Sequence, residues 1–399
     1  MELILGVRGG NCYFPAFKAK RGIVHINIAS LGLLGVAAFS KEAVPALHAD
    51  NWTPGSRISG GAVLPSSSGL LWELESVIVS DDEGLFILGQ ISSALKVITE
   101  EGPRLLLADQ KFNHIKLFTF SGDFVSTLGQ AGEGPGDIPS HFLVTVDSEN
   151  RLYVAGMGAT VSLLNSDGTW LKHFKRGDPF NIVQDIKVDA AGNLYLVAPN
   201  LSNHFLIHKY APNQEGYDYV TSFGESYVLA SRSYDPKGEQ YYAGGSIDIS
   251  QDGYLYFSQR VPFKLQKYTL DGKLILSCEE GDNIDGKEFV PEPPEIEYGP
   301  GGRMRLKFPA ISAHIWCLLG DRILNCAYSP EMDGRRTTLI TVHNATDLKP
   351  ACEPIVLDGV RTIVGVDLDV DPTISCGRVF LASEDLDKGA KIESYLLRF

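Results

Sequence analysis

A short β-type segment recurs six times after residue 100, and it limits the folds open to the chain more than any other feature. Each copy follows a turn residue and centres an aromatic or apolar side chain in a run of strand-forming residues. The central residues are Leu106, Tyr153, Tyr195, Tyr256, Leu324 and Phe380. They lie 42 to 68 residues apart, a spacing that predicts an array of similar supersecondary units rather than one two-sheet sandwich.

The residues around each copy describe the rest of the repeating unit. A strand that ends in an acid or a serine precedes several copies, as in DIKVDAAGN. A further strand and a D-G or S-G turn follow, as in LQKYTLDGKL, and the glycines supply the positive φ angles that tight hairpins require. Acids such as Asp147, Asp189 and Asp252 are expected to bond their own backbone in these turns. Four antiparallel strands at this period are typical of a propeller blade.

Six central residues predict six blades, and helical periodicity is hard to find after residue 50. The stretch 70–80 is a strand region without a full repeat of its own, while the last blade runs out at 392–399. We therefore expect the N-terminal strand to pair with the C-terminal strands, which hides the sheet edges at both ends. The predicted fold is an all-β, six-bladed β-propeller of four-stranded antiparallel blades in residues 50–399, with insertions at about 211–244 and 279–308.

The segment DQKFNHIKLFTFSGDFVSTLGQAGEGPGDI (109–138) resembles the NHL-repeat family of six-bladed propellers. The family pattern is followed by Leu107-Ala108-Asp109, Asn113-His114-Ile115, Phe118 and Gly122. Other blades follow it in part, so that the resemblance covers about two thirds of the chain. It implies the fold, and similarity to exported, largely uncharacterised bacterial members. It says little about function, because such propellers include binding modules, lyases and lactonases.

The first 49 residues carry the parts of an export signal. Basic residues precede an apolar run from Ile23 to Phe39, and small residues follow it. The favoured prediction is a secretory signal behind a mis-assigned start codon; an uncleaved signal anchor and a buried core helix are the alternatives. The run is short and polar for a membrane span, since it contains His25, Asn27 and Ser30. We therefore predict an exported protein, periplasmic or extracellular, without a membrane span in the mature chain.

Charge and cysteine content argue against nucleic-acid binding, a disulfide-built scaffold and a zinc site. The chain has 35 basic and 49 acidic residues and no basic patch, so nucleic acid is not an expected partner. Six cysteines are too few for a disulfide-built scaffold, and their spacing fits no zinc pattern. A turn at Asp321-Arg322 would place Cys317 opposite Cys326, which is compatible with a cross-strand disulfide and equally with two buried thiols.

The first insertion is rich in tyrosine, because seven of the sixteen tyrosines fall within residues 210–242. A tyrosine ring combines an apolar face with a polar tip and suits sugars, peptides and protein surfaces. Packing of these rings onto the propeller is the alternative explanation. The candidate binding residues of this segment are Tyr227, Tyr234, Tyr241 and Tyr242.

The second insertion is acidic, with eight acids between Glu279 and Glu297 opposed by Lys287 alone. Such carboxylates could gather Ca²⁺, but the ligand spacing of a calcium loop is missing, which favours a solvated surface loop. Residues 281–287 imitate a phosphate-binding loop. We reject that interpretation because Glu288 stands where Ser or Thr is needed and no helix is expected to follow.

The central channel of a propeller is its usual ligand site, lined by the innermost strand of each blade. The predicted inner strands are 94–98, 141–147, 183–189, 245–250 and 364–369. Candidate binding residues near the starts of these strands are His141, Gln184, Asp185 and Ser246. Metal-dependent lactonases of this fold hold one calcium with side chains from several blades. That likeness suggests Asp185, Asp248 and Asp367 as metal ligands, although no lactonase motif matches residue by residue.

No nucleophile elbow, zinc-protease motif or paired C-x-x-C motif is present in the sequence. We therefore predict an exported β-propeller that binds a protein, peptide or carbohydrate, with no evident cofactor or catalytic machinery. The alternative is a calcium- or zinc-dependent lactonase or lyase with its site in the central channel. A structural subunit of an envelope complex is a third interpretation.

Overall fold

The computed structural model describes residues 63–65, 71–80, 86–132, 134–156, 160–175, 183–200, 204–226, 243–260, 263–278, 295–298, 304–307, 311–328, 337–373, 375–385 and 389–398. The chain divides into two units, Met1–Ala46 and Leu47–Phe399, and every described residue belongs to the second. The predicted leader therefore lies outside the described residues. Among those residues we find no helix, and so no helix suited to cross a membrane.

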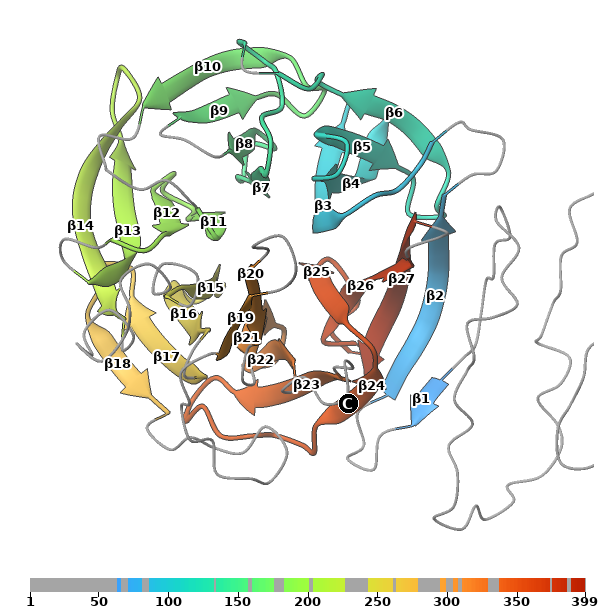
Figure 1. Cartoon of the computed structure of the whole chain (residues 1–399), viewed down its shortest axis with the longest axis vertical. Coiled ribbons are helices and arrows are strands. Elements are labelled where there is room, and N and C mark those ends of the chain that lie inside the picture. Colours follow the sequence, from blue (N-terminus) through green and yellow to red (C-terminus); the bar gives the residue numbers. More distant parts are fainter. Residues whose placement is uncertain are drawn as a thin grey trace, which may run out of the picture. The chain divides into compact units, whose positions relative to one another are not determined.

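Six antiparallel sheets stand around a ring (Figure 1), which confirms the predicted six-bladed propeller. Blade 1 contains β3 (Ile91–Thr99), β4 (Gly102–Asp109), β5 (His114–Phe118) and β6 (Phe124–Leu128). Blade 2 contains β7 (Leu143–Val146), β8 (Leu152–Ala155), β9 (Thr160–Leu164) and β10 (Trp170–Lys175). Blade 3 contains β11 (Asp185–Val188), β12 (Leu194–Val197), β13 (Phe205–Pro212) and β14 (Tyr217–Glu225).

The second half of the ring continues the pattern. Blade 4 contains β15 (Gly245–Ile249), β16 (Tyr254–Gln259), β17 (Lys264–Thr269) and β18 (Leu274–Ser277). Blade 5 contains β21 (Ile311–Leu318), β22 (Arg322–Tyr328), β23 (Thr337–Asn344) and β24 (Ile355–Asp358). Blade 6 contains β25 (Arg361–Asp367), β26 (Gly377–Asp385), β27 (Gly389–Arg398) and β2 (Leu71–Val79), with β1 (Val63–Pro65) beyond β2.

Blade 6 closes the ring with strands from both ends of the chain. β2 runs antiparallel to β27, from the pair Leu71 and Arg398 to the pair Val79 and Lys391. The predicted pairing of the terminal strands is therefore confirmed. As a result, neither β27 nor the side of β2 that pairs with it is an open sheet edge.

The packing explains the repeat, because each sheet buries both of its faces against neighbouring blades. All six central residues named above lie on the second strand of a blade and are at most 1% exposed. Leu106 of blade 1, for example, shares a buried cluster with Val144 of blade 2, and Tyr195 of blade 3 shares one with Phe257 of blade 4. The aromatic or apolar residue at the centre of the repeat thus packs between neighbouring blades and stabilises their contact.

The acidic turns of the repeat also have a clear physical role. Asp147 Oδ1 accepts the Arg151 N–H at 2.9 Å, while its Oδ2 accepts the hydroxyl of Tyr153 at 3.2 Å. Asp189 does the same for the turn of blade 3 and for Tyr195. In blade 4, Ser250 takes this place, and Asp252 binds the Ser250 hydroxyl rather than the turn backbone.

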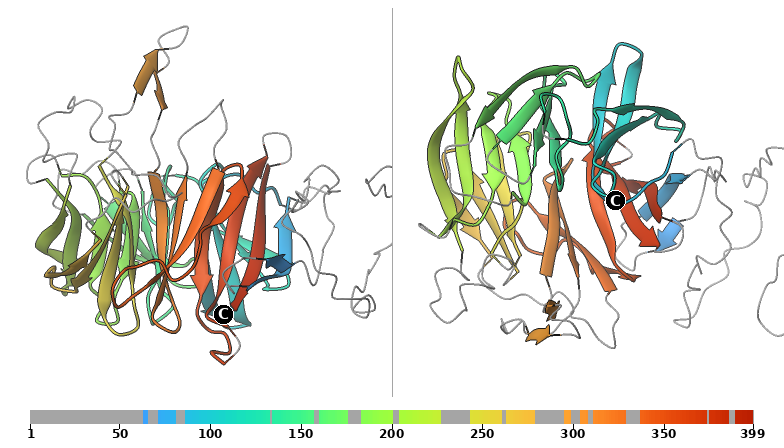
Figure 2. Two further views of the ribbon diagram at one scale, coloured as in Figure 1. Left: turned by 90° about the horizontal axis from the view of Figure 1, so that it is seen from below. Right: turned by 45° about the horizontal axis from the view of Figure 1, so that its top comes forward.

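The two ends of the ring differ. At one end, which we call the turn face, tight turns join the inner strand to the second strand in blades 1 to 5, as at Asp147 and Asp189, and residues 368–376 make this connection in blade 6. The inner strands begin at the opposite end, the loop face, where the longest connections, β14 to β15 and β18 to β21, also lie. The second of these holds the hairpin β19 (Glu295–Tyr298) and β20 (Met304–Lys307), which stands away from the ring in Figure 2.

The structure relocates part of the predicted tyrosine-rich insertion. Tyr210, Tyr217 and Tyr219 lie on β13 and β14, so they belong to blade 3. Tyr210 is buried, and the Tyr217 hydroxyl donates to the carbonyl of Gly192. Only residues 226–244 connect blades 3 and 4, and 227–242 lie outside the described residues. Most of the acidic segment between Glu279 and Glu297 does so as well.

The hairpin β21–β22 decides between the two interpretations of its cysteines. Leu318 pairs with Arg322, so that Cys317 faces Ile323 and Cys326 faces His314. The turn is therefore centred earlier than the sequence suggested, and the two cysteines are not cross-strand partners. Both are buried free thiols.

Candidate functional site

Three neighbouring inner strands place polar side chains side by side near the centre of the ring. Alternate residues of a strand share one face, and here the intervening residues, such as Ile186 and Ile247, are buried between blades. The polar residues, which we call the polar arc, are Asp185 and Lys187 on β11, Ser246 and Asp248 on β15, and His314 and Trp316 on β21.

The acids and the serine of the polar arc bind backbone amides of the next blade. Asp185 Oδ2 accepts the N–H of Ile247 at 2.9 Å and the Ser246 hydroxyl at 2.5 Å. Ser246 Oγ in turn accepts the N–H of Ile315 at 3.3 Å. An inner strand has a neighbouring strand on one side only, so the N–H groups on its other side have no backbone acceptor. The side chains of the preceding blade accept these hydrogen bonds instead.

Asp248 has the same role one step further along the ring. Its Oδ2 accepts the N–H of Cys317 at 2.7 Å, while its Oδ1 lies 3.2 Å from Lys187 Nζ. Lys187 Nζ also lies 3.9 Å from the ring centre of Trp316, in cation–π geometry. Burial lowers the pKa of Lys187, but Asp248 and Asp185 outweigh that effect, so its pKa lies above the ordinary value. Lys187 is therefore a fixed cation that links three blades.

The structure brings together three of the predicted binding residues. Gln184 donates to the carbonyl of Ala243 at 2.8 Å and accepts the N–H of Gly245 at 3.2 Å, so it clasps blade 4 beside Asp185 and Ser246. His141 lies in an exposed turn before β7, and within the described part of the chain no hydrogen bond joins it to the other three. Tyr227, Tyr234, Tyr241 and Tyr242 lie outside the described residues.

His314 is the histidine of the polar arc, and its pKa is lowered. Burial lowers its pKa to about 4; Asp185 opposes the shift, and the positive charges of Arg260 and Lys187 add to it. The imidazole is therefore neutral at pH 7. Its ring stacks at 6.5 Å from that of Trp316.

Arg260 completes the group at the loop face. It follows β16, and its backbone N–H donates to the carbonyl of Gly244, just before β15. Burial lowers the pKa of its guanidinium, with Tyr328 acting in the opposite direction. Arg260 and His314 are both half-buried, so solvent reaches them.

The candidate metal ligands divide between two places. Asp185 and Asp248 belong to the polar arc, whereas Asp367 lies at the end of β25 and accepts Arg378 Nη1 at 2.9 Å. Arg378 also binds Glu75 on β2, with Nε 2.6 Å from Oε2. Among the residues that the structure describes, no three His, Cys, Asp or Glu side chains are grouped as a metal site requires.

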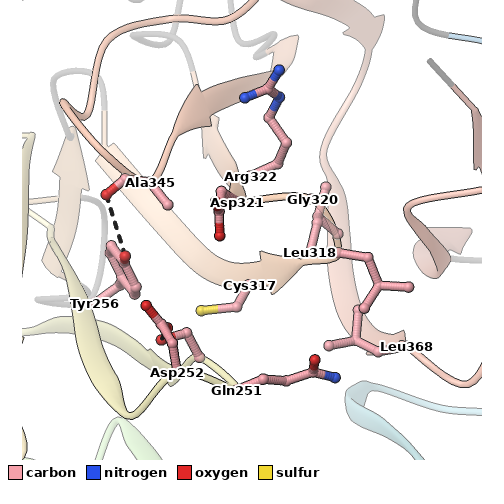
Figure 3. A pocket seen from close by; sticks show the side chains of 12 residues that line it. Gln251, Asp252, Tyr256, Cys317, Leu318, Gly320, Asp321, Arg322, Ala345 and Leu368 are labelled. Atoms are coloured by element: carbon pink, nitrogen blue, oxygen red, sulfur yellow. Dashed lines mark hydrogen bonds between the residues drawn. The ribbon is translucent and has the colours of Figure 1, made fainter. Parts of the chain in front are cut away.

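A cavity of about 210 Å³ lies at the turn face, at the junction of blades 4 and 5 (Figure 3). Its lining includes Asp252, Asp321 and the thiol of Cys317, and Tyr256 donates to the carbonyl of Ala345 at one side. Burial, reinforced by Asp248, holds the pKa of Cys317 well above its usual value, so the thiol is protonated and unreactive. The cavity is smaller than a typical small-molecule site of ~300–1,000 Å³.

Sequence reasoning missed Lys187, Arg260 and Trp316, and did not select His314 from the scattered histidines. For His314 and Trp316 the cause is β21, which follows the second insertion and was not among the predicted inner strands. Lys187 lies within the predicted inner strand 183–189 but was not selected there. A usable signal was present, because DRILNCA needed a preceding strand, and the run HIWCLL before its turn is rich in apolar and aromatic residues.

Comparison with known proteins supports the fold. No family model and no curated protein matches the sequence. A member of the DUF4221 family from Bacteroides vulgatus has a similar structure, with 11% identity and a TM-score of 0.53 over 84% of this chain and 99% of that chain. Below 25% identity such a likeness shows the fold alone. The chain is therefore a six-bladed β-propeller whose site must be interpreted from its own residues.

Two further solved structures show weaker similarity. A protein assigned as exported from Bacteroides fragilis has 10% identity and a TM-score of 0.49, over 84% of this chain and 97% of that chain. Virginiamycin B lyase from Staphylococcus aureus has 13% identity and a TM-score of 0.41, over 85% of this chain and 94% of that chain.

Proposed function

We propose that this chain is an exported, NHL-like ligand-binding β-propeller, periplasmic or extracellular, that binds a protein, peptide or carbohydrate at the loop face of blades 3 to 5. One observation carries the proposal: polar side chains are concentrated on three consecutive inner strands, next to the two longest connections of the ring. Loops on a rigid scaffold are a common place for binding residues. The tyrosines of the first connection fit the same use.

The chemistry of the described groups favours binding over catalysis. A general base needs a lone pair that is available to the substrate. Both oxygens of Asp248 are engaged, by Cys317 N–H and Lys187, and Asp185 holds two groups of blade 4. A metal-dependent lactonase or lyase is the alternative prediction, and nothing in the described residues favours it.

The test is direct binding of the full chain to glycan and peptide arrays, followed by titration of the ligands found. His314→Gln is the site variant, and Lys273→Ala is its control, since Lys273 is exposed in a turn of blade 4 at the turn face. We expect His314→Gln to weaken binding about tenfold, the effect of one lost hydrogen bond of ~1.5 kcal/mol, and Lys273→Ala to leave it unchanged. Equal loss in both variants would contradict the proposed site.

A second arm tests the enzymatic alternative. We expect the same thermal midpoint in EDTA and in excess Ca²⁺ or Zn²⁺. A metal bound only by the native state would add ~2.7 kcal/mol at a hundred times its dissociation constant. A midpoint that falls in EDTA and recovers with metal would therefore favour the lactonase or lyase.

A further inference from the structure

Three hydrogen-bond donors, two on β21 and one just after β16, have no acceptor within the described part of the chain. The Arg260 guanidinium forms no hydrogen bond or ion pair there, and neither ring nitrogen of His314 is hydrogen-bonded there. Trp316 is only 8% exposed, yet its buried Nε1 has no partner. Buried polar groups in native proteins nearly always find partners, so unused donors on or beside two neighbouring strands, β16 and β21, need an explanation.

The two acids and two bases of this region balance in number, but the described residues give Arg260 no acid of its own. Lys187 is compensated by Asp248, and Asp185 is engaged by Ser246 and the N–H of Ile247. Arg260 has no such acid among the described residues, although it is close enough to His314 to depress the pKa of the imidazole. A partly buried guanidinium is normally paired, because an isolated charge is costly to remove from water.

We propose that the ligand bound at the loop face presents a carboxylate or phosphate group to Arg260, His314 and Trp316; this rests on the proposed function above. The planar guanidinium matches the geometry of a carboxylate or phosphate and forms two parallel hydrogen bonds with it. An anion would also form an ion pair with the Arg260 guanidinium, which an uncharged hydroxyl or amide ligand cannot do. The indole N–H adds a directional donor, and His314 gains one when it takes up a proton.

Removal of the Arg260 charge separates this explanation from a purely structural one. Arg260→Met keeps the length of the side chain but lacks the charge. We expect the free variant to be at least as stable as the natural protein, because it loses an unpaired, partly buried cation. A residue needed only for folding would behave in the opposite way.

The experiment measures two properties of the full chain with inorganic phosphate, succinate and glucose as probes. One is the thermal midpoint, and the other is the pKa of His314 followed by NMR of its ring proton. Phosphate or succinate should raise both, since an adjacent anion favours the imidazolium, whereas glucose should change neither. Arg260→Met should weaken anion binding about 10- to 100-fold, and Lys273→Ala should not. Chloride at equal ionic strength controls for screening.

The outcomes separate this inference from the proposed function. Failure of phosphate and succinate to move either property beyond chloride would overturn the anion proposal. It would also be overturned if a ligand from the arrays bound the loop face with an affinity unchanged in Arg260→Met but reduced in His314→Gln, and in that case the binding function would stand. Array ligands that bind His314→Gln as tightly as the natural protein would instead overturn the site itself.

Discussion

The junction between blades 6 and 1 and the junctions among blades 3, 4 and 5 use the same position of the repeat in opposite ways. That position is the inner-strand residue paired with the central residue of the second strand. In blade 6 it is Gly365, opposite Phe380, and in blade 4 it is Asp248, opposite Tyr256. A Cβ atom on Gly365 would lie 1.7 Å from the carbonyl oxygen of Ala94 in blade 1. The two inner strands therefore meet backbone to backbone.

Blades 3 to 5 leave room for side chains at this position, and the side chains are Lys187, Asp248 and Trp316. Their contacts replace the close backbone approach with hydrogen bonds and an ion pair. The inner strands of blades 6 and 1 are thus held by close backbone packing, whereas those of blades 3 to 5 are held by hydrogen bonds and an ion pair. On this polar side, a ligand could supply partners to Arg260 and His314.

The largest effect on the free energy of unfolding is expected at the junction of blades 6 and 1, where the two backbones are in close contact. Gly365→Ala should cost about 3 kcal/mol or more, since the new methyl group meets a backbone oxygen that cannot move aside easily. Thr145→Ala changes the same repeat position in blade 2 and should cost about 1 kcal/mol or less. Urea unfolding of both variants measures the difference. Similar losses in the two would mean that the close approach at Gly365 is not specific to this junction.

A smaller effect is expected on the polar side. Asp248→Ala should cost about 2–3 kcal/mol, because Lys187 loses its counter-charge and the Cys317 N–H loses its acceptor. The double variant with Lys187→Met should recover part of that loss, since no buried cation is then left unpaired. A double-mutant cycle of unfolding free energies with no coupling would show that this ion pair does not hold the blades together.

The smallest effect concerns pH. The pKa of His314 is about 4 in the folded protein and ~6.5 in an unfolded chain, so the unfolded state takes up the proton first. Acid therefore favours unfolding between about pH 6.5 and 4, with a loss of about 1 kcal/mol between pH 7 and 5.5. Asp185, Arg260, Lys187 and the Trp316 ring face the imidazole. His314→Gln should flatten this part of the stability curve; the same slope in both proteins would assign it to other groups.

The repeat made the fold predictable, because burial between blades requires an apolar centre at each copy, and the tight turns use an acid or a serine as acceptor and a glycine or an asparagine at positive φ. Tyr153 with Asp147 shows both requirements in one hydrogen bond. The site was less predictable. Asp185 and Ser246 were correctly placed near the starts of inner strands, but sequence alone did not show that backbone amides of the next blade engage them. Trp316 was missed because its strand follows an insertion that hides the period.

The pairing of β2 with β27 sets the order in which the molecule can be completed. Blades 1 to 5 each consist of consecutive segments, so each can form as soon as its own residues are available. Blade 6 needs residues near both ends, and residues 71–79 must wait for a partner that is synthesised last. Such long-range pairing slows folding, so the ring opens or closes as one late event. A chain cut short near either terminus would keep five blades and still lack a closed ring.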